Sequence, residues 1–560
     1  IKKWFQLHSN NPYGGPGTAP SIRIRGFGSI NGSNSPLYVV DGFVFEGSIA
    51  DLNSNDIESM TVLKDATSAA LYGNKASNGV IIITTKKAKN EGKPTVTFTT
   101  NHGLYTRGLA EYERLGADDW MEMEWRGYRN YAMSTAALSY DEATAGAFAT
   151  KNLVADVIKN NIYNAADNAL FDANGNLTAS IKPGYTDLDW EKELVKKGYR
   201  REYGVSFASS SDKYNVFASL DYMNEDGYIL NTNFERYSAR VNTSFTPVSW
   251  FKGGINLNAT KQEQNYNSNA NGSYYANPFY QLRYEAPIYP IYLHNADGSI
   301  ILDDNGEKVY DTVSDWRSNR HIIFERLRDY ERNGRLTLDA SAFATFILPY
   351  GFEISFKANT NFRTRQYKKY DNPEIGDGAT NNGRFRQSEY HYNTVNLQQM
   401  VNWSHDYGRH HIDAMVAHES YSYDYNYMNT MNSNMSLPGI YEMGNFTTNS
   451  SHPSGYSYDD RSESFLGRAR YNFNQKYFFE ASFRRDGSSR FSEAKRWGNF
   501  WSVGASWDIT REDFMSYASW VDFLKLRASF GTAGNVGSID YYAYQDLYEL
   551  DKNGGNPALY

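Results

Sequence analysis

The chain has 560 residues, of which 16% are aromatic, and its 46 Tyr outnumber both its 31 Phe and its 11 Trp. The formal net charge of −8 gives no basic field for binding nucleic acid, and the absence of Cys excludes disulfides and thiolate metal sites. No apolar run approaches the ~20 residues that a membrane-spanning helix needs, which excludes a helical membrane protein.

Residues 1–90 predict a small α+β domain. Short apolar segments at 22–24 and 39–40 have the composition of strands, and a Gly- and Asn-rich loop without candidate catalytic groups lies between them. Segment 65–72 predicts a helix that ends at Gly73, because glycine accepts the left-handed conformation that commonly ends a helix.

Five blocks of this domain occur in a fixed order between residues 12 and 100: SIRIRG, SINGSN, PLYVVDG, KDATSAALYG and NGVIIITTKK. In order and spacing they resemble the plug domain of the SusC/RagA-type TonB-dependent outer-membrane transporters. The rest of the chain is similar to this family in its strand pattern and in short stretches such as FERYSAR and LRASFGTAGN. The resemblance implies an all-β membrane fold, in which an antiparallel transmembrane β-barrel holds an N-terminal α+β plug domain inside its lumen.

From Thr95 onward, segments of about ten residues alternate apolar with polar or small side chains, which is typical of a transmembrane barrel. In segment 214–222, Tyr, Val, Ala, Leu and Tyr occupy every second position, and Asn, Phe, Ser and Asp lie between them. Successive side chains of a strand point to opposite faces, so we expect the first set to face lipid and the second to face the lumen. The two Tyr are about 26 Å apart along the strand, which a tilt of ~40° shortens to roughly the height of the apolar band of a barrel.

Such segments predict roughly 14 strands. They lie near residues 95, 202, 214, 236, 250, 334, 351, 393, 409, 464, 476, 498, 522 and 540. Barrels of plugged transporters have about 22 strands, and an open sheet edge in hydrocarbon leaves backbone groups unpaired at several kcal/mol each. We therefore expect residues 91–560 to be part of a barrel whose last strands follow Tyr560, and we expect the first part of the plug to precede Ile1.

Long insertions between the predicted strands are expected at 110–198, 262–320, 364–390 and 425–460, as extracellular loops, because outer-membrane barrels keep their periplasmic turns short. Their Tyr rings and their Asn and Asp acceptors suit glycan stacking or peptide capture. A simpler interpretation of each large ring is that it packs within its own loop. The large rings are those of Trp120, Trp125, Trp190 and Trp316.

The outward loop of the plug is the predicted substrate contact. Its candidate residues are Phe27, Ser29, Asn31, Asn34 and Ser35. The competing interpretation is a tight loop made of residues that tolerate positive φ.

Arg23 and Arg25 lie on one face of the SIRIRG strand, and a charged pair inside a barrel persists only where carboxylates meet it. One hypothesis is that they anchor the plug to acids of the barrel wall, and an equal alternative is that they pair within the plug. The candidate wall acids are Asp221, Asp339, Glu480 and Asp508, and the candidate plug acids are Asp41 and Asp65.

No enzyme activity, cofactor or metal site is expected, because the residues that such chemistry needs are not grouped anywhere. Acidic turns at Asp172, His294 and Asp303 have oxygens that calcium favours but no complete ligand loop. They predict hairpin turns, with structural calcium in the extracellular loops as the weaker alternative. His410 and His411 would point to opposite faces of a strand and do not predict a shared ion.

The family resemblance implies active import of large nutrients, usually oligosaccharides, across the cell outer membrane of a Gram-negative bacterium. The implied partners are a SusD-type surface lipoprotein that acts as a lid, the TonB–ExbB–ExbD complex, and outer-membrane lipid with lipopolysaccharide; nucleic acid is not among them. Two alternatives stay open: import of oligopeptides by the same mechanism, and a structural role as a plugged barrel within a larger outer-membrane assembly.

Overall fold

The structure is a computed structural model of the 560-residue chain. It describes all residues except 1–6, 11–14, 25, 27–29, 31–32, 64–70, 90–92, 109–111, 266–276, 315–318, 519, 549, 554–555 and 560, and it describes no side chains for 7–10, 550–553 and 556–559.

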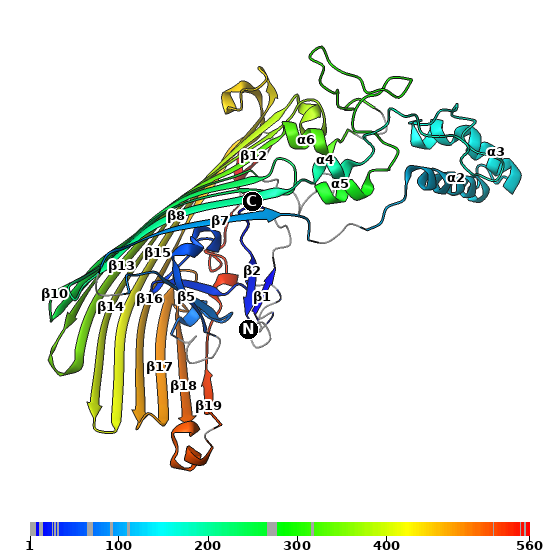
Figure 1. Ribbon diagram of the computed structural model, residues 1–560. Helices are drawn as coiled ribbons and strands as arrows, with labels where there is room; N and C mark the ends of the chain where they lie inside the picture. Colours follow the sequence, from blue (N-terminus) through cyan, green and yellow to red (C-terminus); the bar gives the residue numbers. More distant parts are fainter. Residues whose placement is uncertain are drawn as a thin grey trace.

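One large antiparallel sheet dominates the molecule. Its thirteen strands follow one another in chain order, each paired with its sequence neighbours. The strands are β7 (Thr95–Tyr105), β8 (Gly198–Ser210), β9 (Tyr214–Asp226), β10 (Asn233–Val248), β11 (Phe251–Asn265), β12 (Tyr330–Ile347), β13 (Phe352–Asp371), β14 (Arg384–Tyr407), β15 (His410–Met435), β16 (Phe446–Phe473), β17 (Tyr477–Ser488), β18 (Trp497–Asp508) and β19 (Lys525–Gly531). The sheet curves around the N-terminal domain (Figure 1). Among the described strands, β7 and β19 each pair on one side only, so the barrel is partial.

The two faces of the sheet differ as the sequence predicts. In β9, Leu220 is 61% exposed on the outer face, whereas Phe217 and Ser219 are only 5% and 6% exposed on the face toward the plug. The same alternation continues in β10, where Tyr237 and Val241 are exposed and their neighbours are buried. The apolar outer face and the polar inner face of a transmembrane wall are therefore both present.

The predicted strand near residue 540 is wrong. A short 3₁₀ helix, η13 (Val536–Ser538), and a turn occupy this segment, and the hairpin of β20 (Leu550–Asn553) and β21 (Asn556–Leu559) is separate from the large sheet. The tyrosines that suggested a strand have another use, since Tyr541 stacks on Tyr458 at 3.9 Å between ring centroids.

The prediction of long insertions at 364–390 and 425–460 is also wrong. Strands β13 and β14 extend through most of the first segment, and β15 and β16 extend through most of the second. The long insertions 110–198 and 262–320 are real, and they lie at the same end of the sheet, here called the loop end. The error arose because strands that leave the apolar band need no apolar outer face, so the alternation that marks a strand in lipid disappears there.

The loop-end insertions carry the helices. These are α2 (Ala117–Ser134), α3 (Glu142–Leu153), the π-helix η4 (Val154–Ile158), α4 (Trp190–Leu194), α5 (Pro278–Tyr284) and α6 (Ile322–Arg328). Helices α2 and α3 project away from the sheet, and α4 to α6 gather above it (Figure 1). Among the described helices, none is both long enough and apolar enough to cross a membrane.

The plug consists of short elements. The β1 (Leu7–Asn10) and β2 (Ser21–Ile24) strands form a hairpin, and four strands form a sheet in the order β4 (Phe43–Val44), β3 (Leu37–Val40), β6 (Val80–Thr85) and β5 (Ile57–Leu63). Three 3₁₀ turns complete it: η1 (Ile49–Asp51), η2 (Ser54–Asp56) and η3 (Gly73–Lys75). Gly73 has a φ of +53°, the left-handed conformation predicted for it, and most of the predicted helix 65–72 lies outside the described residues.

Candidate functional site: the plug and the wall around it

The acidic turn of the plug, η1 to η2, is shaped by its own side chains. Ser48 caps η1 by accepting the amide of Ala50, and Asp51 returns the bond by accepting the amide of Ser48 at 3.0 Å. Asn53 caps η2 by accepting the amide of Asn55 at 3.1 Å. These local bonds fix the backbone, so that Asp51 and Asp56 point into the wall and are almost completely buried.

Strands β10 to β13 meet this turn with four inward arginines, Arg236, Arg240, Arg335 and Arg363, which we call the arginine sector. The Arg240 guanidinium lies 3.3 Å from Asp56, and Ser219 donates to the same carboxylate at 2.7 Å. Asp51 pairs with Arg335.

The remaining two arginines of this sector also contact the plug. Arg236 donates to the carbonyl of Leu52 at 3.3 Å and to Asn53 at 3.2 Å, and Arg363 donates to the carbonyl of Glu46 at 3.2 Å. A buried ion pair adds little net stability compared with apolar packing, but removing one partner is costly because the other charge stays buried. Separating the plug from the arginine sector therefore costs free energy.

Further along the sheet, the plug contacts β15 at Tyr421, which meets Glu46 and Lys75 of the plug. Tyr421 donates to Glu46 at 3.0 Å, and Lys75 lies 3.4 Å from the same carboxylate and 3.6 Å from the centroid of the Tyr421 ring. Burial alone would raise the pKa of Glu46, but Lys75 and the hydrogen bond from Tyr421 outweigh burial and lower it. Glu46 therefore stays charged in this contact.

A second contact lies on β17. The backbone amide of Asn74 donates to Asp486 at 2.8 Å, and Arg484 donates to the carbonyl of Leu71 at 2.7 Å. A Cβ added to Gly73 would lie 2.0 Å from the Asp486 carboxylate, so only glycine fits this close approach.

Above Tyr421, toward the loop end, three neighbouring strands carry an unusual set of rings, here called the tyrosine wall. It consists of Tyr390 and Tyr392 on β14, Tyr425 and Tyr427 on β15, and Tyr456 and Tyr458 on β16. The register aligns them in two rows across the strands, with Tyr392, Tyr425 and Tyr458 in one row and the others in the second row. Paired residues share a face, and even spacing along β15 places the set on the same face as Tyr421, which touches the plug.

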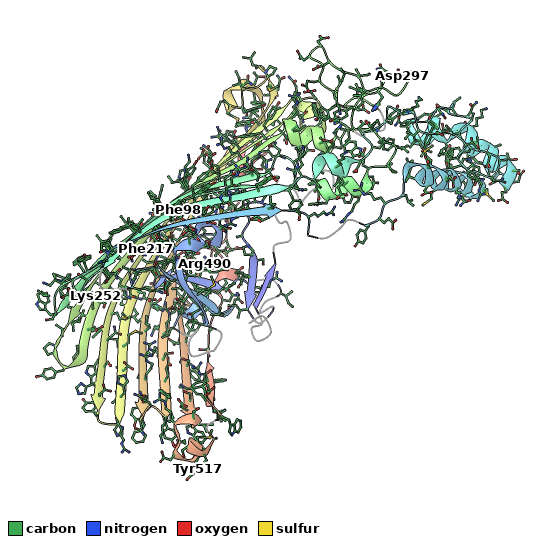
Figure 2. All side chains as sticks on the ribbon, viewed as in Figure 1. Phe98, Phe217, Lys252, Asp297, Arg490 and Tyr517 are labelled. Atoms are coloured by element: carbon green, nitrogen blue, oxygen red, sulfur yellow. The ribbon has the colours of Figure 1, made fainter. Side chains whose placement is uncertain are left out.

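The rings of the tyrosine wall contact one another. The centroid distance is 4.5 Å between Tyr425 and Tyr458, 4.8 Å between Tyr390 and Tyr427, and 5.1 Å between Tyr392 and Tyr425. Arg490 covers the neighbouring Tyr541 ring at 4.0 Å and is held by Asp460 at 2.9 Å; Figure 2 places Arg490 beside the plug.

Three predicted substrate contacts, Phe27, Ser29 and Asn31, lie outside the described residues. Asn34 is half-buried and Ser35 is exposed. Their neighbour Ser33 accepts hydrogen bonds from Asn78 at 2.7 Å and from Asn535 at 3.2 Å. Substrate contact by this loop stays a prediction.

The anchoring role of Arg23 also stays a prediction, and Arg25 lies outside the described residues. Arg23 lies in β2, which pairs with β1. Three of the candidate wall acids have other described partners: Asp221 accepts from Asn55 at 3.3 Å, Asp339 accepts from Asn359 and Asn361, and Asp508 lies 3.2 Å from Arg511. In the plug, Asp41 accepts the amide and the hydroxyl of Thr85.

Sequence reasoning missed the opposite arrangement, in which plug acids meet wall arginines. A signal was present: Arg236 and Arg240 are separated by four residues in FERYSAR, so both face inward, and Asp51 and Asp56 bracket the polar stretch DLNSND. The pairing joins residues 184 positions apart, which local patterns do not reveal.

Of the four large loop rings, three pack within the insertions. Trp125 donates to Thr150 at 2.9 Å in a core with α3, and Trp190 donates to the carbonyl of Tyr289 at 2.8 Å. Trp120 packs edge-on against Tyr289, and Trp316 lies outside the described residues.

The acidic turns are hairpin turns, as predicted. Gly175, Gly298 and Gly306 have positive φ at their tips, and bridges flank each turn. Backbone and side-chain hydrogen bonds from Ser299 lower the pKa of Asp297, and two amides of its own turn donate to Asp172. Calcium in these loops stays a prediction.

Comparison with known proteins shows what the N-terminal domain and the whole chain are similar to. Residues 6–80 match the family model of the TonB-dependent receptor plug domain. TonB-dependent receptor P3 of Formosa agariphila is 26% identical over 96% of this chain and 47% of its own length, and TonB-dependent receptor SusC of Bacteroides thetaiotaomicron is 25% identical over 96% of this chain and 50% of its own. The structure described as the RagAB peptide transporter has a TM-score of 0.77 at 22% identity, over 100% of this chain and 60% of the other.

These matches confirm the resemblance to SusC/RagA-type TonB-dependent transporters. The chain spans about half the length of the curated relatives it matches. The fold is that of the family, a plug domain enclosed by a mostly antiparallel β wall that is partial in this chain.

Proposed function

We propose that the protein imports oligosaccharides across the outer membrane of a Gram-negative bacterium by TonB-dependent transport. One observation carries this proposal: a folded plug is fastened to the inner face of the strand wall by buried polar contacts from several strands. A lumen wide enough for an oligomer would leak if it were open, so the plug closes it. A ligand shifts an equilibrium only by its differential affinity, so external work must move the plug.

In this scheme the TonB–ExbB–ExbD complex supplies the work and a SusD-type surface lipoprotein closes the loop end as a lid. The similarity to SusC and to the RagAB structure supports both partners. The similar proteins are named as receptors and transporters, so we propose no catalytic activity.

Import of oligopeptides is the second candidate function. It is favoured by one observation, the likeness in fold to a structure described as a peptide transporter. The same inner wall and plug would serve both kinds of cargo, since each is a flexible oligomer too large for an open pore.

The test is deletion of the full-length gene, followed by growth on a panel of single polysaccharides and of peptide mixtures, with uptake of labelled oligomers measured in cells with and without TonB. We expect growth to fail on one polysaccharide and its uptake to require TonB. Failure on peptides alone would establish the second candidate. Unchanged growth and uptake on every substrate would contradict import and would favour the structural role within a larger outer-membrane assembly.

A further inference from the structure

The tyrosine wall occupies the part of the inner face that cargo must pass. It lies on the loop-end side of the Tyr421 contact with the plug. Tyr456 is 58% exposed, and Tyr390, Tyr392 and Tyr427 are half-buried, so the surface presents ring faces, ring edges and hydroxyl groups. A cluster of this kind offers apolar contact and hydrogen bonding together.

Two arginines border this wall. Arg365 on β13 pairs in register with Tyr390, and its guanidinium lies 4.8 Å from the centroid of that ring. Arg386 on β14 is four residues from Tyr390, so it shares the same face, and it is exposed. Their described hydrogen bonds go to neutral atoms: Arg365 donates to Asn333 at 2.8 Å, and Arg386 donates to the sulfur of Met431 at 3.5 Å.

Two of the acids that face the lumen nearby are already neutralised, and a third, Glu331 on β12, accepts a hydrogen bond from Tyr367 at 3.1 Å. Asp460 is held by Arg490 at 2.9 Å, and Glu46 is held by Lys75 and Tyr421. Among the described residues, no carboxylate lies within ion-pair distance of Arg365 or Arg386, whose described hydrogen bonds go to neutral atoms. The border of the tyrosine wall therefore has positive charge without a matching carboxylate, and it can attract an anion.

The backbone of β14 and β15 in this region is not available for strand addition by an extended peptide. Strands β14 and β15 are each paired on both sides along the tyrosine wall, so their amides and carbonyls are occupied, whereas β16 pairs with β17 only from Ser462 onward and is paired at Tyr456 and Tyr458 with β15 alone. Strand addition needs a free sheet edge. What the wall does offer is a set of ring faces and hydroxyls, which fit sugar rings better than a peptide main chain.

We infer that the tyrosine wall, with Arg365 and Arg386, is a contact surface for an anionic oligosaccharide, one whose sugar rings carry carboxylate or sulfate groups. The rings stack on the tyrosines, and the acidic groups pair with the arginines. The inference rests on the proposed import function and names the class of cargo and the place where the wall recognises it.

The test measures binding to the purified full-length protein in detergent. The probes are an oligogalacturonate, a neutral gluco-oligosaccharide of equal length and a glutamate-rich peptide of similar charge. The double variant R365Q/R386Q should bind the oligogalacturonate about tenfold more weakly or worse, and its affinity for the neutral probe should not change. The double variant Y427A/Y456A should weaken binding of the oligogalacturonate about three- to tenfold. Rising ionic strength should weaken binding of the oligogalacturonate to the wild type and should leave its binding to R365Q/R386Q unchanged.

The control variants carry the same substitutions on the outer face. Arg461→Gln removes a β16 arginine that pairs with Asp424 at 2.6 Å on the opposite face, and Tyr237→Ala removes an exposed outer tyrosine; neither should change binding. Equal or tighter binding of the peptide, binding of the neutral probe alone, no binding of any probe, or an unchanged affinity in R365Q/R386Q would each overturn the inference. The import function is judged separately by growth and TonB-dependent uptake, so it stands if those are lost on deletion while this inference fails.

Discussion

The arginine sector and the tyrosine wall are two regions of one inner face, and they differ in their contacts with the plug. In the arginine sector, guanidinium groups on β10 and β12 pair with the buried plug acids Asp56 and Asp51. The tyrosine wall is uncharged, and the described contacts of the plug with β15 lie at its base, where Glu46 and Lys75 meet Tyr421. Among the described contacts, the ion pairs between plug and wall are therefore concentrated on the side of the arginine sector, whereas β15 and β17 hold the plug by hydrogen bonds.

The difference implies an order of release. Separating the plug from the arginine sector uncovers charges on both partners, whereas separating it from Tyr421 breaks a hydrogen bond whose carboxylate keeps Lys75. The side of the tyrosine wall should open first, and the arginine sector should act as the hinge. Variants on each side test this asymmetry.

Asp56→Ala should have the largest effect. It leaves Arg240, which is 5% exposed, without its carboxylate, and the loss of one partner of a buried pair costs about 3–5 kcal/mol. The local opening free energy of β5 and β6, measured by hydrogen exchange, should fall by that amount. The matched control is Glu58→Ala, two residues away, which removes the surface pair with Lys89 and should cost under about 1 kcal/mol. Equal losses in the two variants would contradict the special role of the arginine sector.

A second charged group lies at the loop end, in and next to α6. Burial raises the pKa of Glu325 to about 7, although Arg320 lies 2.8 Å away, and burial raises the pKa of Asp329 to about 6. A carboxyl with a raised pKa in the folded state binds its proton better there than in the unfolded chain. Its contribution is therefore present below the unfolded pKa of about 4.3 and is lost as pH rises through the folded pKa.

Hydrogen exchange of α6 at pH 5 and pH 8, corrected for intrinsic rates, should accordingly show an opening free energy about 3 kcal/mol lower at pH 8. Glu325→Gln should remove most of this pH dependence. Glu142→Gln, an exposed carboxylate at the start of α3, should leave it as in the wild type. An opening free energy that rises with pH would show that Arg320 governs Glu325 more strongly than burial does.

The sequence predicts the faces of the strands well and their contacts poorly. The two-residue alternation of 214–222 places Phe217 and Ser219 inside, because the period belongs to the backbone itself. The same two-residue period runs through 421–427, but its tyrosines face inward, so an aromatic set does not by itself mark the lipid face. No local pattern reveals that Asp56 meets Arg240, since that contact depends on how the plug sits in the closed wall.

Tyr421→Phe tests the contact between the plug and β15, which we expect to be weaker than the contact with the arginine sector. It removes the hydroxyl that donates to Glu46 and keeps the ring under Lys75. The plug should lose about 1.5 kcal/mol of local stability by hydrogen exchange. Tyr237→Phe removes a similar bond to Glu235 on the outer face and should leave the plug unchanged. A loss as large as that in Asp56→Ala would place the main anchor on β15 and reverse the proposed order of release.

Tyr456→Ala should have the smallest effect on stability. Its side chain is more than half exposed and its contacts are to other rings of the tyrosine wall, so the free energy of unfolding and the plug opening energy should change by less than about 0.5 kcal/mol. Hydrogen exchange of the plug and thermal unfolding measure this. A surface kept for cargo tolerates such a truncation, because its rings are not needed to hold the fold. A large loss of plug stability would instead mean that the tyrosines are structural, and the contrast between the two regions would then be one of residue type without a difference in role.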